Sequence, residues 1–239
     1  CIFLLGKGVP KFIHTYIESK VKKTIVIDNI NDKAKLESFI KPNNLIVLDG
    51  YSFNSEFQLG LKTLDCKIIL ISDFSEQPKH VDAIIDHSPD KKKYKSNKNV
   101  LMALGPKYSL LRPIFRNMST EPGSLNSIKK CFVCFGGADP YELSIKATEA
   151  LLLFEEIENI SIVTQNYEKI NKKFKSETRV KIYTNLTEIK MAKLMKESDL
   201  AIAPASTLLF EICAVKTPIL SGYFTDNQKS IYNGMANIG

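Results

Sequence analysis

Residues 129–153 read KKCFVCFGGADPYELSIKATEALLL and predict a strand, a glycine turn and a helix in direct succession. Residues 131–135 form a continuous apolar run, which is typical of a strand buried on both faces. Gly136 and Gly137 allow close approach of the backbone, and Asp139 can cap the helix that follows. The stretch therefore predicts a βα turn whose free N–H groups and helix dipole suit a phosphate.

The same turn is also consistent with a structural role alone, because a tight βα connection needs glycine for its own geometry. It lacks the spacing G-x-x-x-x-G-K-[ST] of a P-loop and the spacing G-x-G-x-x-G of a dinucleotide site. A phosphate bound here would therefore not be held by either of these two motifs.

Length and composition limit the class of protein. The chain has 239 residues, and its 44% hydrophobic and 25% charged residues are ordinary values for a globular protein. No apolar run reaches the roughly 20 residues of a transmembrane helix. The net charge of +7 suits a nucleic acid, an anionic membrane or a small phosphorylated ligand. The basic run at 91–98 lacks repeated aromatic residues, so we expect a solvated loop and no nucleic-acid partner.

The cysteines point to a reducing environment. Five cysteines at irregular spacing do not form a disulfide framework, and we expect a cytoplasmic monomer with no disulfide bonds. Cys131 and Cys134 lie three residues apart in a predicted strand, where their side chains point to opposite faces. We therefore assign both to the core and not to a redox or zinc pair.

The first half of the chain alternates short apolar runs with amphipathic segments, as a parallel sheet with crossover helices does. The expected strands are 1–5, 24–27, 44–48, 67–72, 83–86 and 101–104, and the expected helices are 9–19, 32–39 and 55–63. Asp49 and Tyr51 follow the strand 44–48. Ligands gather at the carboxyl ends of such strands, so both are candidate site residues, although either could instead be a loop cap.

The second half repeats this alternation. Residues 119–127 are rich in Ser, Thr, Pro, Gly and Asn, and they predict a boundary between the domains 1–122 and 123–239. The expected strands are 130–135, 159–164, 180–183, 200–203 and 219–223, and the expected helices are 143–154, 167–174, 188–197, 206–215 and one that begins at 227. The fold class is therefore α/β in two domains.

A second turn with a capped helix reads APASTLLFE at 203–211. Ser206 or Thr207 can cap that helix. Glu211 lies more than one turn inside it among apolar neighbours, where a carboxylate needs a partner. A ribose diol would supply one, because an ionised carboxylate accepts two hydrogen bonds. A position on the exposed side of the helix, without a ligand, fits the pattern equally well.

Taken together, several segments resemble the UDP-sugar hydrolases of pseudaminic acid biosynthesis, in the wider group that contains the MurG glycosyltransferase. They are DGY at 49–51, GPKYSLLR at 105–112, FGGADP at 135–140, Ser206 and Thr207 with Glu211, and NQ at 227–228. The resemblance covers nearly the whole chain. It implies a GT-B-like fold, in which two Rossmann-like domains face a central cleft and the C-terminal domain holds most of the nucleotide.

The family reaction that the resemblance implies is the hydrolysis of UDP-2,4-diacetamido-2,4,6-trideoxy-β-L-altropyranose to UDP and the free sugar, with no metal and no cofactor. The substrate-binding residues that it implies are Asp49, Tyr108, Arg112, Gly136, Gly137, Ala138, Asp139, Leu186, Ser206, Thr207, Glu211 and Gln228. Residues 136–138 would approach the diphosphate, residues 206–207 would add phosphate or ribose contacts, Glu211 would bind the ribose, and Leu186 would lie against uracil.

Tyr51 and Asn227 match the positions that the family places beside the sugar and the attacking water, so they are the candidate catalytic residues. In the family, a Gly-x-Gly-His turn after the first strand supplies the general base, and this sequence has no such turn. His14, His80 and His87 do not replace it, and for His87 we expect a capping or surface role. We interpret the sequence as lacking the first βα unit, or alternatively as non-catalytic. A doubly wound domain without its central strand would contain a gap in its sheet.

Three functions remain open from the sequence. A hydrolase would use water, a transferase would replace the water by an acceptor hydroxyl or amine, and a binding module would hold the UDP-sugar without turnover. An exposed apolar patch on the N-terminal domain would favour transfer to a lipid acceptor.

Overall fold

The computed structural model describes residues 1–29, 32–50, 52–72, 78–89, 94–95, 97–118, 127–137 and 139–238. The chain divides into two compact units. The N-terminal unit comprises 1–72, 76–85 and 96–102, and the C-terminal unit comprises 73–75, 86–95 and 103–239. The boundary predicted at 119–127 falls almost entirely outside the described residues, and the structure groups 103–118 with the C-terminal unit.

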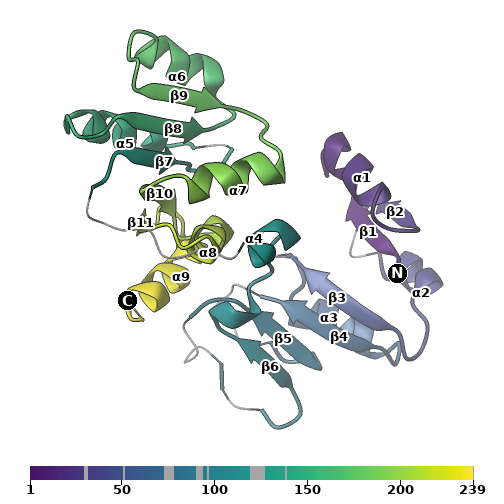
Figure 1. Ribbon diagram of the computed structural model, residues 1–239. Helices are drawn as coiled ribbons and strands as arrows, with labels where there is room; N and C mark the ends of the chain where they lie inside the picture. Colours follow the sequence, from purple (N-terminus) through teal and green to yellow (C-terminus); the bar gives the residue numbers. More distant parts are fainter. Residues whose placement is uncertain are drawn as a thin grey trace. The chain divides into compact units, whose positions relative to one another are not determined.

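The N-terminal unit alternates strands and helices as the sequence predicts (Figure 1). Its elements are β1 (Phe3–Gly6), α1 (Lys11–Glu18), β2 (Thr24–Ile27), α2 (Lys33–Phe39), β3 (Leu45–Asp49), α3 (Ser55–Lys62), β4 (Lys67–Ile71), β5 (Ala83–Asp86) and β6 (Leu101–Leu104). The last residues of β5 and β6 are grouped with the C-terminal unit. Asp32 and Asn54 start α2 and α3, since their side chains accept hydrogen bonds from backbone N–H groups.

The strands of this unit form two separate sheets. β1 and β2 pair in parallel, and β3, β4, β5 and β6 form a four-stranded sheet in that order. In the described part of the chain, no pairing joins β1 or β2 to β3, so β3 has a free edge. Leu45 and Val47 on β3 are 63% and 54% exposed. Within the described residues the β1–β2 pair and the four-stranded sheet are therefore not joined, which is an interruption of the sheet.

The C-terminal unit has the complete strand order of a Rossmann-like sheet, β11-β10-β7-β8-β9. Its elements are α4 (Pro113–Asn117), β7 (Lys130–Val133), α5 (Leu143–Leu152), β8 (Asn159–Val163), α6 (Tyr167–Phe174), β9 (Val180–Tyr183), α7 (Glu188–Lys196), β10 (Leu200–Pro204), α8 (Thr207–Ala214), β11 (Ile219–Gly222) and α9 (Asp226–Ala236). Neighbouring strands are parallel throughout. The chain runs outward from β7 to β9 and then returns to β10, so the topological switch point lies between β7 and β10.

Helices cover both faces of this sheet, and successive residues of β7 alternate between them. Cys131 and Val133 pack in the core on the α5 and α6 side, whereas Phe132 and Cys134 pack in the core on the α7 and α8 side. The two cysteines therefore point to opposite faces, as predicted. Burial raises the pKa of the Cys131 thiol to about 11, so this thiol stays protonated and unreactive.

Two short elements were not predicted from the sequence, a 3₁₀ turn at Pro106–Tyr108 and the helix α4. α4 has five residues, too few to show a helical period. Its Phe115 is 1% exposed and lies in the core beside Ala192 and Met195 of α7. This burial explains why residues 103–118 belong with the C-terminal unit.

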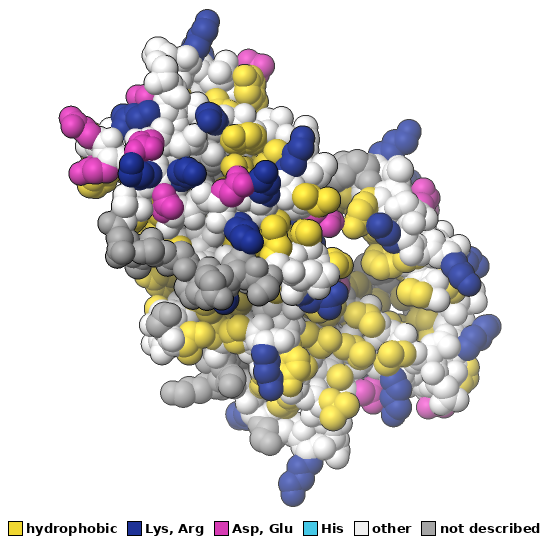
Figure 2. Space-filling model, in the orientation of Figure 1, with side chains coloured by type: hydrophobic (Ala, Val, Ile, Leu, Met, Phe, Trp, Pro, Cys, Tyr) yellow, Lys and Arg dark blue, Asp and Glu magenta, His cyan; other side chains and the backbone are white. Residues whose placement is uncertain are grey.

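The charge of the protein is dispersed on the face drawn in Figure 2, where lysine and arginine side chains are scattered and interspersed with acidic ones. This distribution differs from the single basic stripe of a typical nucleic-acid interface. None of the helices in the described residues combines the length and the apolar character that a membrane span needs.

Candidate functional site

The glycine turn after β7 has the geometry that the sequence predicts. Gly136 has a φ of 82°, in the left-handed region that favours glycine. A Cβ atom added at Gly137 would meet only the Cγ of Gln165, at 3.6 Å, which is an ordinary contact. Gly137 is therefore not required by local packing. Ala138, the third predicted diphosphate residue, lies outside the described residues.

Asp139 caps α5, as predicted, and this changes where a phosphate could bind. Its carboxylate accepts hydrogen bonds from the N–H groups of Leu143 (2.8 Å) and Ser144 (2.9 Å), and the residue is only 6% exposed. The N–H groups of Ile145 and Lys146 donate to the carbonyl of Glu142. The first N–H groups of α5 are thus already bonded, so the expectation that they are free for a phosphate was wrong. A phosphate at this place would therefore have to be bound by the backbone of the glycine turn and not by the start of α5.

Replacing Asp139 by alanine should destabilise the C-terminal unit by about 1–2 kcal/mol, the usual cost of removing a helix cap. The reason is that two N–H groups at the start of α5 would lose their acceptor. Urea unfolding followed by circular dichroism measures the change in midpoint. The control is Asp226→Ala, which removes an exposed carboxylate from the first turn of α9. Equal stability of Asp139→Ala and this control would contradict the capping role.

The turn after β10 carries Ser206 and Thr207, the two hydroxyl residues that were predicted to contact the phosphate or the ribose. Ser206 is the N-cap of α8, and its hydroxyl accepts a long hydrogen bond of 3.4 Å from the N–H of Leu208. Thr207 is exposed at the first position of the helix. Since β7 and β10 are neighbours, this turn and the glycine turn lie at the carboxyl ends of adjacent strands, on the two sides of the switch point. Open α/β sheets bind their ligands at this place.

Glu211 has the partner that its buried position requires. Its carboxylate accepts two hydrogen bonds from the Arg112 guanidinium, from Nε to Oε1 at 2.7 Å and from Nη2 to Oε2 at 2.8 Å. The Glu211 side chain is 12% exposed and that of Arg112 is 36% exposed. Such a bidentate ion pair fixes the plane of the carboxylate. Two predicted substrate-binding residues, 99 positions apart, therefore meet within the C-terminal unit.

The first turn of α9, which follows β11, carries Asn227 and Gln228. Gln228 is 8% exposed, and its Oε1 accepts a hydrogen bond of 3.0 Å from the N–H of Phe224. Asn227 is exposed, and its Oδ1 accepts from the Thr225 hydroxyl at 2.7 Å. β11 is the neighbour of β10, so this turn lies beside the Ser206 turn at the same edge of the sheet. Gln228 thus holds the loop before α9 in place, while Asn227 lies at the exposed start of that helix.

The other predicted residues are more dispersed. Tyr108 is partly exposed in the 3₁₀ turn, with the Lys107 Nζ 4.8 Å from the centre of its ring. Leu186 is half-buried after β9, the edge strand two places from β7. Asp49 is exposed at the end of β3 in the N-terminal unit, and Tyr51 lies outside the described residues.

For His87 we expected a capping or surface role, and the structure contradicts the surface position. It is 8% exposed, and its ring lies 4.9 Å from that of Phe210, the residue before Glu211, in an edge-to-face arrangement. Only the tertiary structure brings this histidine against α8. Across the described residues, no three His, Cys, Asp or Glu side chains are grouped so that they could hold a metal ion.

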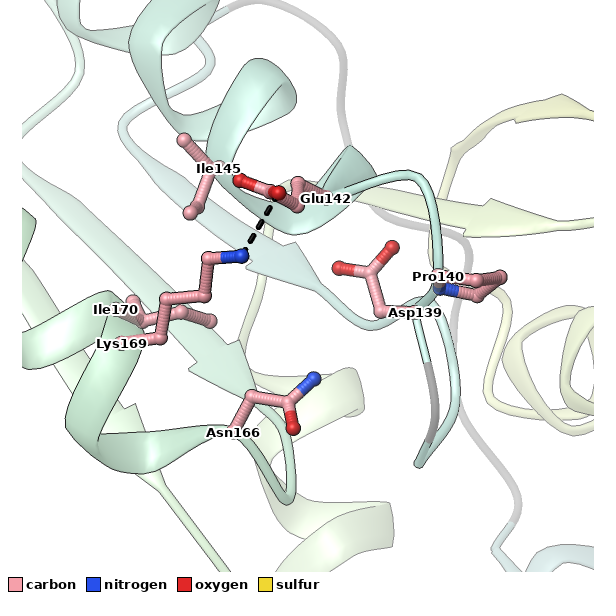
Figure 3. Close-up of a pocket in the computed structure, with 7 residues that line it drawn as sticks. All are labelled: Asp139, Pro140, Glu142, Ile145, Asn166, Lys169 and Ile170. Atoms are coloured by element: carbon pink, nitrogen blue, oxygen red, sulfur yellow. Dashed lines mark ion pairs between the residues drawn. The ribbon is translucent and has the colours of Figure 1, made fainter.

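A cavity of about 220 Å³ lies between the loops that follow β7 and β8 (Figure 3). Lys169, the one cation among the described lining residues, points toward Glu142 and pairs with it at 2.7 Å, and this hydrogen bond lowers the pKa of Glu142. Asp139 supplies a second carboxylate. Because the described residues of its lining are net acidic, this cavity does not suit a diphosphate.

The chain is similar in sequence to three curated proteins. It is 29% identical over 234 residues to an uncharacterized protein of Methanocaldococcus jannaschii. That alignment covers 91% of this chain and 48% of the Methanocaldococcus protein, so the chain spans about half the length of this relative. It is 25% identical over 251 residues to the UDP-2,4-diacetamido-2,4,6-trideoxy-beta-L-altropyranose hydrolase of Campylobacter jejuni, and the alignment covers 100% of this chain and 85% of the hydrolase. It is 23% identical over 190 residues to the spore coat polysaccharide biosynthesis protein SpsG of Bacillus subtilis, and the alignment covers 75% of this chain and 56% of SpsG. No protein-family model matches the chain.

Two solved structures share the fold. MurG of Acinetobacter baumannii aligns with a TM-score of 0.64 at 13% identity, over 99% of this chain and 75% of that one. The UDP-GlcNAc 2-epimerase of Methanocaldococcus jannaschii aligns with a TM-score of 0.52 at 11% identity, over 98% of this chain and 83% of the epimerase. The fold is therefore α/β and GT-B-like, built from two Rossmann-like domains.

Proposed function

We propose that this chain is part of a UDP-sugar hydrolase that releases UDP and a 2,4-diacetamido-2,4,6-trideoxyhexose in nonulosonic (pseudaminic) acid biosynthesis. The observation that carries the proposal is the pairing of the glycine turn and the Ser206 turn across the switch point, where open α/β sheets take ligands. The similarity to the Campylobacter jejuni hydrolase, which extends over the entire chain, supports it. The free cysteines suit a cytoplasmic enzyme.

In this proposal the C-terminal unit holds UDP. The N–H groups of the turn at Gly136 and Gly137 bind the diphosphate, and Ser206 and Thr207 add hydroxyl contacts from α8. Glu211 accepts hydrogen bonds from the ribose diol. Because Arg112 uses one lone pair of each Glu211 oxygen, the ribose either takes the remaining lone pairs or displaces the guanidinium.

The chemical step transfers the sugar to water. A water oxygen attacks the anomeric carbon, the bond from that carbon to the diphosphate breaks, and UDP leaves with the electron pair. Tyr51 and Asn227 orient the water and the sugar, but both are neutral at pH 7 and neither is a suitable base. The proton of the water therefore needs another acceptor. We expect residues 1–239 alone to bind UDP without hydrolysing the sugar nucleotide.

A glycosyltransferase is the second candidate, supported by the fold likeness to MurG. It would use the same nucleotide site and replace the water by an acceptor hydroxyl or amine. The exposed apolar residues of β3 do not by themselves favour a lipid acceptor, because they lie at the interruption of the sheet.

One incubation separates these functions. The natural protein and residues 1–239 are each mixed in water with the UDP-linked diacetamido-trideoxyhexose, and NMR follows the release of UDP and of the free sugar. Release by the natural protein without an acceptor supports the hydrolase, and release only with an added acceptor supports the transferase. UDP binding with neither reaction leaves a binding module. Rapid hydrolysis by residues 1–239 alone would contradict our account of the missing base.

A further inference from the structure

Two aromatic rings come from the loops that follow the two neighbours of β10, at the edge of the sheet where the proposed nucleotide site is found. Tyr141 follows the glycine turn after β7, and Phe224 precedes α9 after β11. Their ring centres are 5.9 Å apart at an angle of 70°, an edge-to-face contact. β7 and β11 flank β10 in the sheet, so this contact spans the end of the strand that leads to Ser206.

Both rings are carried by loops that hydrogen bonds hold in place. The N–H of Phe224 donates to the buried side chain of Gln228, and Asp139 ties the loop before Tyr141 to the start of α5. Tyr141 nevertheless remains 56% exposed. A large ring that is fixed in position while most of it faces solvent is suited to contact with a ligand, because no ordering of the ring is needed when the ligand binds.

The position of the pair relative to the proposed site indicates which part of a ligand it would meet. The glycine turn, on one side, is the proposed diphosphate position, and Asn227, on the other, is the proposed sugar position. Tyr141 lies in the loop that carries the glycine turn, Phe224 lies in the loop that leads into α9 and Asn227, and the two rings are in contact. A sugar attached to the diphosphate would therefore lie against the rings, whereas the nucleoside, held through Glu211, would lie against α8.

We propose that Tyr141 and Phe224 form an apolar wall of the sugar subsite that selects sugars with methyl and acetamido groups over sugars that carry only hydroxyl groups. This inference rests on the proposed function. Methyl groups gain from contact with an aromatic ring, whereas a hydroxyl group placed there loses hydrogen bonds to water. A 6-deoxy sugar with two acetamido groups presents three methyl groups to such a wall, and glucose presents none.

Calorimetry with UDP, UDP-GlcNAc and UDP-glucose tests the wall, because the two sugars differ in one acetamido group. We expect the wild-type protein to bind UDP-GlcNAc more tightly than UDP-glucose. Tyr141→Ala and Phe224→Ala should each reduce this preference about five- to tenfold while leaving the affinity for UDP within about twofold. Tyr141→Phe keeps the ring and should keep the preference. The control is Tyr167→Ala, at an exposed tyrosine of α6 on the β8 side.

Each result gives a distinct answer. If both alanine variants bind UDP normally and keep the preference for UDP-GlcNAc over UDP-glucose, the rings do not form a sugar-selecting wall, whereas the proposed function is unaffected. An equal loss of affinity for all three ligands would mean that the rings only support the phosphate turn, which also overturns the wall. A folded wild-type protein with no affinity for UDP would overturn the proposed function and the wall together. Near-UV circular dichroism of each variant checks that the C-terminal unit is folded.

Discussion

The substitution Gly137→Asp should lower the affinity for UDP by at least about 100-fold, with little loss of stability. At a separation of 4 Å and an effective dielectric constant of about 20, two like charges repel by roughly 4 kcal/mol, and the diphosphate carries more than one charge. The fold should tolerate the side chain, because a Cβ atom at this position meets only the flexible Gln165 side chain. Isothermal calorimetry with UDP measures the loss, and urea unfolding measures the stability.

The matched control is Gly137→Asn, which has the shape of aspartate without its charge. If a diphosphate lies at this turn, the asparagine variant should lose far less affinity than the aspartate variant. Equal losses would indicate that the added volume alone disturbs the turn. Unchanged affinity in Gly137→Asp would remove the diphosphate from the turn, and the glycines would then have only the structural role that a tight βα connection demands.

The second large effect is expected for Glu211→Ala, which should weaken UDP binding at least about tenfold, since a hydrogen bond to a charged group contributes about 1.5–3 kcal/mol. Binding of inorganic pyrophosphate should not weaken, because only the ribose contact is lost. It should even strengthen if the Arg112 guanidinium, released from its partner, turns toward the phosphates. Calorimetric titrations with the two ligands compare the effects directly.

The control for this experiment is Glu168→Ala, which removes an exposed carboxylate from the first turn of α6. It changes the net charge by the same amount at a distance from the switch point, so it reports the general electrostatic effect. Equal losses for UDP and pyrophosphate in Glu211→Ala would mean that the carboxylate serves the structure, through its pair with Arg112, and does not bind the ribose.

The regular elements of the fold were predictable because each carries its own local signal. The alternation of apolar runs and amphipathic segments places the strands and helices within a few residues, and the apolar run 131–135 identifies a central strand. α4 was not found, because five residues are shorter than the period that reveals a helix. Its assignment depends on the burial of Phe115, which only the tertiary structure shows.

The candidate site was predictable in its turns and not in its pairings. Glycine and serine at the ends of β7 and β10 follow from local chemistry, since turns and caps use these residues. The pair of Arg112 and Glu211 joins residues 99 positions apart, and no spacing rule connects them. The role of Asp139 shows the limit of the local argument: the residue that marks the helix start also occupies the N–H groups that a phosphate would need.

The interruption between β1 and β3 has a consequence for how the protein behaves in concentrated solution. Among the described residues no strand pairs with the outer edge of β3, so a row of N–H and C=O groups lacks a strand neighbour there, beside the exposed side chains of Leu45 and Val47. Natural proteins usually guard such edges with charges, prolines or bulges, since an unguarded edge recruits strands from other molecules. In β3 only Asp49, at its carboxyl end, is charged. Residues 1–239 thus carry an aggregation-prone edge at β3. At high concentration, we expect the β3 edges of two molecules to pair and lower the solubility of the protein.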